Sequence, residues 1–205
     1  MSIKETDNEK LILEAAEAEF VEKGYGKSRT TEIAKRAGVN HAMLHYYFRT
    51  KENLFEVVFQ KKAKLMSEVL LFSFMQDLPF LEKIKKGIED HFDLVAKNSN
   101  LPNFIFNEIT HDDRLKTLFV NVIREKANAI INSLKQEISQ EVEKGTIRHI
   151  DAYDLLFSIV SLNIFVFIGK PLISGILELD DSQFDRFLEH RKQMNVEIIL
   201  NQLKV

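Results

Sequence analysis

Glycine and proline are scarce in this chain, with 7 Gly and 3 Pro among 205 residues. Strand-and-turn architectures need many such residues, so the sequence supplies them poorly. The abundance of Leu, Ile, Glu, Lys and Ala favours helix instead. The sequence therefore predicts an all-α protein.

Apolar periodicity and capping residues predict about nine helices. We expect the first helix to start at the capping box Thr6–Glu9 and to end at Gly24, which is a common helix stop. Its apolar stripe consists of Ile12, Ala16 and Phe20. The later helices are expected at about Thr30–Ala37, Asn40–Arg49, Thr50–Met75, Phe80–Lys97, Pro102–Thr110, Arg114–Lys144, Tyr153–Ile168 and Ser182–Leu203. The helix at 114–144 is unusually long, and one continuous helix, a kinked one and a split one are all open.

Several function classes lack the residues that they need. Without cysteine there are no disulfides, thiolate metal sites or cysteine nucleophiles. The chain has no Gly-rich phosphate loop, no dinucleotide fingerprint and no Gly-x-Ser-x-Gly elbow. We therefore predict no catalytic residues, no metal site and no cofactor. The polar N-terminus lacks a signal-peptide core, and the apolar run Leu155–Ile168 is too short to span a membrane, so we expect a cytoplasmic protein.

Residues 30–48 have the pattern of a helix-turn-helix, which needs two short helices joined by a tight turn. Gly38 supplies the residue that tolerates positive φ. Small and apolar residues fit the contact between the helices, namely Ile33, Ala34, Ala37, Val39 and Leu44. Asn40 is a good N-cap for the second helix. The residues that remain outside are His41, Ala42, His45 and Tyr46, with Met43 beside them, and they can reach base edges and phosphates in a major groove.

Charge is distributed unevenly along the chain. The net charge is −3, yet the segment from Lys27 to Lys51 contains one acidic residue, Glu32. Its basic residues are Lys27, Arg29, Lys35, Arg36, Arg49 and Lys51. A basic patch on a mildly acidic protein is typical of a DNA-binding module, although a solvated charged face would look the same.

The first quarter of the chain resembles the tetracycline-repressor (TetR) family of regulators. The segments that carry the resemblance are Gly24-Tyr25, Thr30-Thr31-Glu32-Ile33-Ala34, Ala37-Gly38-Val39, Tyr47-Phe48 and Lys51-Glu52-Asn53-Leu54. The rest of the chain agrees only in helix count and length. One departure is His45, which stands where the family usually has Tyr.

The resemblance implies a role for individual residues. Thr30, Thr31 and Lys51 should contact phosphate, Lys51 with help from the dipole of the helix that it begins. His41, Ala42 and Met43 should face bases, and Tyr46 and Tyr47 should contact phosphates or bases; simple packing is the alternative for Met43 and Tyr47. The predicted DNA-binding set is Thr30, Thr31, Asn40, His41, Ala42, Met43, His45, Tyr46, Tyr47 and Lys51.

Two further interpretations of the histidines have less support. The i, i+4 spacing of His41 and His45 can bind zinc, but Ala42 stands where the metalloprotease pattern needs Glu, and no third ligand is placed. His91 and His111 lie near carboxylates and are more often solvated or capping residues than ligands.

The C-terminal part is rich in Phe, and most of these residues must belong to a plain core. The resemblance also implies a cavity among the middle helices, whose apolar walls would suit a small hydrophobic ligand. The residues predicted to line it are Phe92, Phe104, His111, Phe119 and Phe165.

The helices at 153–168 and 182–203 are the candidates for dimerisation, because the first is apolar on nearly every face and the second carries a row of large apolar residues. A buried pair within a monomer is the alternative. We therefore expect a DNA-binding domain at 1–50 and a ligand-binding and dimerisation domain at 51–205. The predicted function is a homodimeric, ligand-responsive regulator, a repressor, that binds a pseudo-palindromic double-stranded operator. A helical scaffold with a vestigial helix-turn-helix is the second candidate and an enzyme the third.

Overall fold

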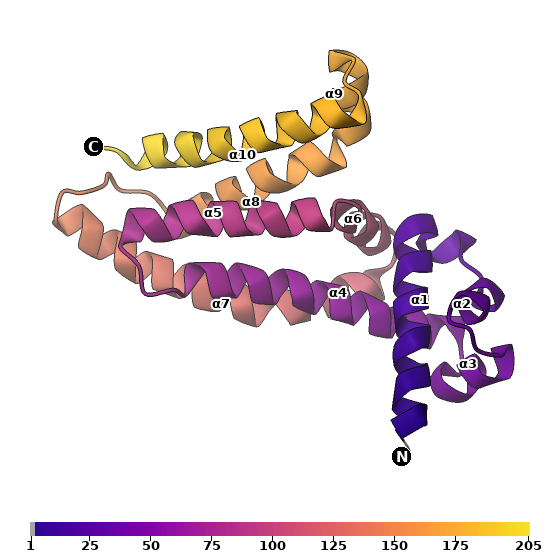
Figure 1. The fold of residues 1–205 in the computed structure, drawn as a ribbon. Coiled ribbons are helices and arrows are strands. Elements are labelled where there is room, and N and C mark those ends of the chain that lie inside the picture. The colour runs from indigo at the N-terminus through magenta and orange to yellow at the C-terminus, as the bar shows by residue number, and fades with distance from the viewer. Residues whose placement is uncertain (1–2) are drawn as a thin grey trace. The chain divides into compact units, whose positions relative to one another are not determined.

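The computed structural model describes the backbone of residues 3–205 and the side chains of residues 7–68, 71–72 and 74–205. Within this range the protein has ten helices and no strand, which confirms the all-α prediction. The helices are α1 (Ile3–Lys27), α2 (Thr30–Arg36), α3 (His41–Phe48), α4 (Lys51–Phe74), α5 (Phe80–Lys97), α6 (Leu101–His111), α7 (Asp113–Glu143), α8 (Ala152–Ile168), α9 (Lys170–Leu177) and α10 (Asp181–Leu203) (Figure 1).

The chain forms two compact units. Unit 1 comprises residues 3–64 and 103–121, and unit 2 comprises residues 65–102 and 122–205. Helices α4 and α7 therefore each have one part in unit 1 and another part in unit 2.

In unit 1 the helices α1, α2 and α3 pack against one another. The predicted stripe of α1 is fully buried at Ile12, Ala16 and Phe20. The α4 residues Phe55 and Phe59 lie in the same core, where the Phe55 ring meets the Phe20 ring edge to face at 4.9 Å. Aromatic packing of this kind adds to the stabilisation from burial alone.

In unit 2 the helices α5, α8 and α10 pack side by side (Figure 1). The core also takes in the Ile-rich face of α7, including Ile130 and Leu134. A second apolar cluster surrounds Phe92, Phe167 and Phe184. No single helix of the described chain is long and apolar enough to cross a membrane, and α8 with α9 reaches that length only as a pair bent by 66°.

Two sequence expectations about helix boundaries were wrong, the start of the first helix and the break after Ile168. The first helix extends back to Ile3, so Thr6 is not its cap; the side chain of Thr6 lies outside the described residues. Gly24 interrupts the regular helix as predicted, with non-helical φ 72° and ψ 169°, and a short helical stretch beyond this kink extends α1 to Lys27. The long helix expected at Arg114–Lys144 is confirmed, since residues 113–143 form one helix. The break expected after Ile168 contains the short helix α9. Its Pro171 is compatible with a helix because it lies in the first turn, where the backbone N–H that proline lacks would have no partner in the helix.

Candidate DNA-binding interface

The turn between α2 and α3 has the geometry of a helix-turn-helix. Gly38 adopts φ +68°, which residues with a Cβ rarely take, as the sequence predicted. The N–H of Val39 donates to the carbonyl of Ala34 at 3.0 Å and closes the turn. Ile33 and Leu44 are completely buried where the helices meet. The turn and its apolar contacts therefore fix α3 against α2.

Helix α3 begins at the predicted cap. The Asn40 side-chain oxygen accepts the N–H of Met43 at 2.7 Å and so satisfies a donor that the helix start leaves unpaired. Asn40 is also in the predicted DNA-binding set, and its Oδ1 atom is engaged in this capping bond.

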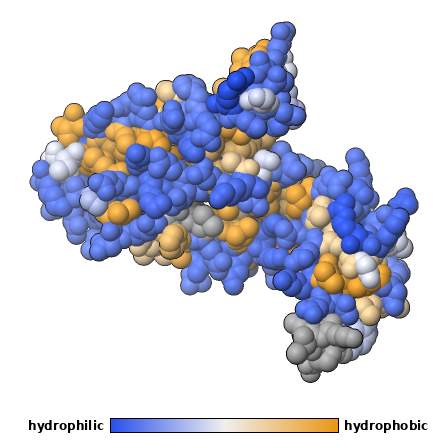
Figure 2. Space-filling model, viewed as in Figure 1, coloured by the Kyte–Doolittle hydropathy of each residue, from blue (hydrophilic) through white to orange (hydrophobic). Residues whose placement is uncertain are grey.

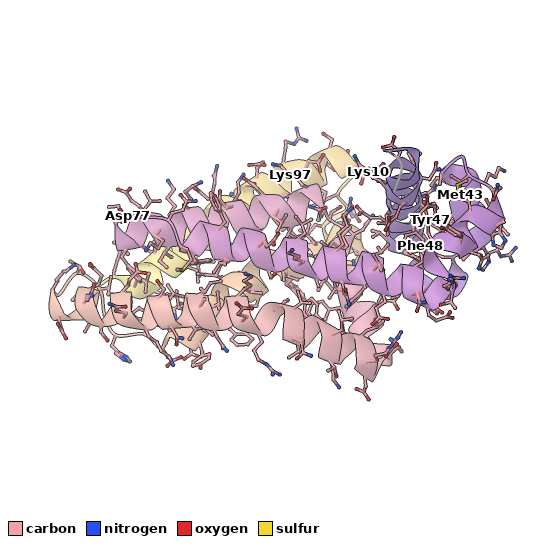
Figure 3. The ribbon with its side chains drawn as sticks, turned by 90° about the horizontal axis from the view of Figure 1, so that it is seen from below. Lys10, Met43, Tyr47, Phe48, Asp77 and Lys97 are labelled. Atoms are coloured by element: carbon pink, nitrogen blue, oxygen red, sulfur yellow. The ribbon has the colours of Figure 1, made fainter. Side chains whose placement is uncertain are left out.

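The outer face of α3 is exposed, as expected. His41, Ala42, His45 and Tyr46 are exposed, and Tyr46 forms an edge-to-face pair with Tyr47 at 5.3 Å. Met43 and Tyr47 are half-buried, so their burial fits both DNA contact and packing. Figure 3 shows the two residues along α3 with Phe48. Phe48 is buried.

Side-chain contacts tie the two histidines to their surroundings. His41 Nε2 lies 2.9 Å from the Thr30 hydroxyl, which joins the start of α3 to the start of α2. The His41 and His45 rings meet edge to face at 4.4 Å. Among the described residues there is no group of three or more His, Cys, Asp or Glu side chains that could hold a metal ion. Thr31 is exposed beside Thr30.

Lys51 starts α4 and is held by an aromatic ring. Its ammonium lies 4.3 Å from the centroid of the Tyr25 ring, a cation–π contact. The Tyr25 hydroxyl donates to Glu52, and burial together with this bond raises the pKa of Tyr25 to about 12, so the phenol remains neutral. Thr50 caps α4, because its hydroxyl accepts the N–H of Asn53 at 3.1 Å. Sequence reasoning missed the role of Tyr25, since it lies 26 positions before Lys51.

The Gly24 kink brings Tyr25 to this position. Helix α6 supports the kink, because the N–H of Tyr25 donates to Glu108 Oε1 at 3.2 Å. The Ser28 hydroxyl donates to the carbonyl of Gly24 at 2.7 Å. These bonds satisfy backbone groups that the kink releases from the helix.

One member of the predicted basic patch serves another purpose. Arg36 pairs with Glu22 at 3.1 Å and lies 3.9 Å from the buried Glu19, so its guanidinium faces the acidic side of α1. Arg29, Lys35 and Arg49 are exposed. The positive surface beside α3 therefore excludes Arg36.

The five residues predicted to line a ligand cavity fall into both units. Phe104 packs between Phe55 and Phe59 at 5.7 and 6.1 Å, and Phe119 meets Phe59 at 6.3 Å. His111 is exposed and bonds its Nδ1 to the carbonyl of Asn107 at 2.7 Å. In unit 2, Phe92 is buried against Phe167, whereas Phe165 is 64% exposed. These contacts explain Phe92 and Phe104 as core residues.

Unit 2 has a hollow of about 550 Å³. Of the residues that line it, the sequence predicted only Phe165 as a ligand contact. It is lined by Ser161, Leu162, Phe165, Val166, Ile173, Phe187 and Arg191. Its signal in the sequence is the helical spacing of Phe187 and Arg191, four residues apart on α10. The hollow is apolar apart from the serine and the arginine.

A buried polar ladder crosses the three packed helices of unit 2. Asn163 of α8 has no exposed surface and donates to the carbonyl of Ile88 at 2.9 Å and to His91 Nδ1 at 3.1 Å. Its oxygen accepts from Asn195 of α10 at 2.9 Å. Asn195 in turn accepts from Arg191 at 2.7 Å. Burial lowers the pKa of His91 to about 4, so this imidazole is a neutral acceptor near neutral pH.

Comparisons with known proteins agree with this geometry. Residues 12–58 match the family described as bacterial regulatory proteins, tetR family, and residues 81–199 match the tetracyclin repressor-like C-terminal domain. The uncharacterized HTH-type transcriptional regulator YhgD of Bacillus subtilis (strain 168) is 28% identical over 183 residues, which cover 84% of this chain and 94% of that protein. The fatty acid metabolism regulator protein of the same organism is 27% identical over 141 residues, covering 67% and 69% of the two chains.

A solved structure shows the same fold. A transcriptional regulator from Saccharomonospora viridis, in complex with choline, superposes with a TM-score of 0.73 over 96% of this chain and 97% of its own, at 18% identity. The two family matches together span the helix-turn-helix and most of the helices that follow it. The chain therefore belongs to the TetR family, whose members are DNA-binding transcriptional regulators and not enzymes.

Proposed function

We propose that the protein is a ligand-responsive repressor that binds a pseudo-palindromic operator as a homodimer. The observation that carries the proposal is the exposed face of α3 on a rigid helix-turn-helix, with Lys51 held beside it over Tyr25. The proposed DNA-binding domain is 1–50, and the proposed ligand-binding and dimerisation domain is 51–205. Because such a regulator acts on the chromosome, its proposed place of action is the cytoplasm.

The proposed DNA contacts divide into positioning and reading. Thr30, Thr31 and Lys51 stand at helix starts, where side chains, N–H groups and the helix dipole suit phosphate oxygens. His41, Ala42 and Met43 occupy the first turn of α3 and are proposed to face base edges. Tyr46 and Tyr47 are proposed to contact phosphates or bases, and Asn40 holds the turn from which they project.

Exposed apolar side chains support the proposed homodimer. On α8, Tyr153, Phe157 and Phe165 are separated by four and eight residues and are 46%, 70% and 64% exposed. Figure 2 shows apolar side chains at the surface of this unit. The exposed apolar residues of α9 and α10 are Leu172, Ile176, Leu177 and Ile198. Burying this surface against a second copy, through 153–168 and 182–203, would remove it from water and so favour association.

We also propose release from DNA by a small hydrophobic ligand. The match to a tetracyclin repressor-like C-terminal domain supports ligand control, and the names of two similar proteins mention fatty acid metabolism and choline. Of the residues predicted from the sequence, Phe165 is the proposed ligand contact, because it lines the hollow of unit 2. A ligand must bind the released state more tightly than the DNA-bound state, because only differential affinity shifts the equilibrium.

Selection of bound fragments from the source genome tests the proposal. A pseudo-palindromic consensus with two half-sites one helical turn or a multiple apart is expected for a dimer. Recovery of fragments without a shared sequence would instead favour the scaffold hypothesis, in which the helix-turn-helix is vestigial.

Two variants then test the division of roles on the selected operator. Lys51→Ala should weaken specific and non-specific binding by similar factors. It should also reduce the salt slope by about one for each phosphate that the protein no longer neutralises, thus about two in the dimer. His41→Ala should cost about 1–3 kcal/mol on the operator and leave non-specific binding nearly unchanged. Identical behaviour of the two variants would contradict the proposed reading face.

A further inference from the structure

The imidazole of His45 is bonded to the backbone at the end of its own helix. Its Nδ1 lies 2.8 Å from the carbonyl oxygen of Arg49, the residue that ends α3. Arg49 adopts φ 63° and ψ −58°, an unusual conformation for a residue with a side chain.

This bond determines where the hydrogen of the neutral ring resides. A carbonyl oxygen only accepts hydrogen bonds, so Nδ1 of His45 must carry the hydrogen. A neutral imidazole has one N–H, and its other nitrogen, Nε2, then offers a lone pair. His45 is exposed, and among the described residues no group is bonded to its Nε2.

The neighbouring histidine is held differently. His41 is bonded through Nε2 to the Thr30 hydroxyl, and a hydroxyl both donates and accepts. The tautomer of His41 is therefore left open by its contact, whereas that of His45 is fixed. Of the two rings on the outer face of α3, only His45 has the tautomer of its neutral form fixed by a contact.

We propose that His45 reads an exocyclic amino group in the major groove, the N6 of adenine or the N4 of cytosine, by accepting its hydrogen at Nε2. This inference rests on the proposed operator binding through α3. The two amino groups are the hydrogen-bond donors of the major groove, while guanine N7 and O6 and thymine O4 are acceptors that would face the lone pair. Phosphate oxygens are acceptors too, so the neutral ring suits a base edge and not the backbone.

Tyrosine, the usual family residue at this position, would not restrict the hydrogen-bond partner in the same way. A tyrosine hydroxyl donates and accepts, so it can face an amino group, a carbonyl or a phosphate. Replacing it with a histidine of fixed tautomer narrows the contact to donors. His45→Tyr is therefore a matched variant that keeps an aromatic side chain on α3 and removes the fixed polarity.

The experiment uses the selected operator with single-base analogues. At each half-site position, adenine is replaced by unsubstituted purine and cytosine by 2-pyrimidinone, which deletes the amino group; 7-deazaguanine, which deletes an acceptor, serves as the control. Dissociation constants are measured for the wild type, His45→Ala and His45→Tyr, and the ratio of wild type to variant cancels the effect of each analogue on the duplex itself.

At one position per half-site, amino deletion should weaken wild-type binding on the order of tenfold, and His45→Ala should show less than about a twofold effect there. His45→Tyr, whose hydroxyl also donates, should lose less affinity than the wild type when that position presents an acceptor instead. An effect coupled to His45 at a 7-deazaguanine position would overturn the inference, because it would make His45 a donor. The inference would also be overturned if the His45 variants bound all duplexes more weakly by the same factor and with a smaller salt slope, because that result indicates a phosphate contact.

Failure of the inference is distinguishable from failure of the proposed function. A wild-type protein that selects an operator while its amino deletions show no coupling to His45 refutes only the inference. A protein that selects no sequence at all refutes the proposed function and the inference with it. Circular dichroism of both variants checks that α3 remains folded, and the tyrosine variant covers the case in which the alanine variant unfolds.

Discussion

Acidification should destabilise this protein through His91, a buried imidazole that its surroundings keep neutral. Burial lowers its pKa from 6.5 to about 4. In the unfolded chain the ring regains its ordinary pKa, so between these two values the unfolded state binds the proton more readily. The contribution of His91 to stability is therefore complete above about pH 6.5 and is lost as the pH falls toward about 4.

The size of the effect follows from the same pKa values. At about 1.4 kcal/mol for each pH unit, lowering the pH from about 7 to about 4.5 should remove about 2 kcal/mol of unfolding free energy through this residue. Carboxylates elsewhere also titrate in this range, so the comparison must be with a variant that cannot be protonated. His91→Gln removes the titration and offers Asn163 an amide oxygen as an acceptor in place of Nδ1.

Two measurements check this prediction. Denaturant unfolding of the wild type and His91→Gln at both pH values should show the wild type losing about 2 kcal/mol more than the variant on acidification. NMR titration of the folded protein should show the His91 ring still neutral at about pH 5. Parallel decreases in the two proteins, or a ring that titrates near 6.5, would refute the argument that burial in the ladder holds His91 neutral.

Three further changes test other parts of the structure. Gly87→Ala would place a Cβ 2.6 Å from the buried Phe74 ring, so it should lower stability by about 1–3 kcal/mol in thermal unfolding despite the better helix propensity of Ala; an unchanged or higher melting temperature would contradict this packing. Phe157→Glu should convert the proposed dimer to monomer at micromolar concentration in light scattering without lowering helix content, whereas Leu162→Glu, at a residue packed against the unit 2 core, should also destabilise the fold. Apolar compounds that raise the melting temperature should also lower operator affinity, and binders that leave affinity unchanged would count against ligand control.

Local signals predicted the helix-turn-helix well. The positive φ of Gly38, the Asn40 cap and the burial of Ile33 and Leu44 depend on residues a few positions apart, which one sequence displays directly. The same local reasoning found the break at Gly24 but not the short helical stretch that follows it to Lys27, because a glycine that permits an unusual φ can kink a helix as well as end it.

Contacts between distant segments could not be predicted in the same way. Tyr25 reaches Lys51 only because the kink at Gly24 turns it there. Phe92 lies between His91 and Asp93 in the sequence yet is buried, whereas Phe157 lies in the apolar run Leu155–Ile168 and is 70% exposed. Periodicity identifies an apolar helix but does not say whether another helix of the same chain or a second chain covers each face.

Helix α8 shows how a single polar residue can settle that question. Because the helix is apolar on nearly every face, burial alone does not select its rotation about its own axis. Asn163 selects it, since an unpaired buried amide is costly and its partners Asn195 and His91 lie on α10 and α5. Turning Asn163 inward leaves Phe157 and Phe165 exposed on the outer side. Asn163, one of the three polar residues that interrupt the apolar run Leu155–Ile168, thus determines which aromatic side chains the proposed dimer surface presents.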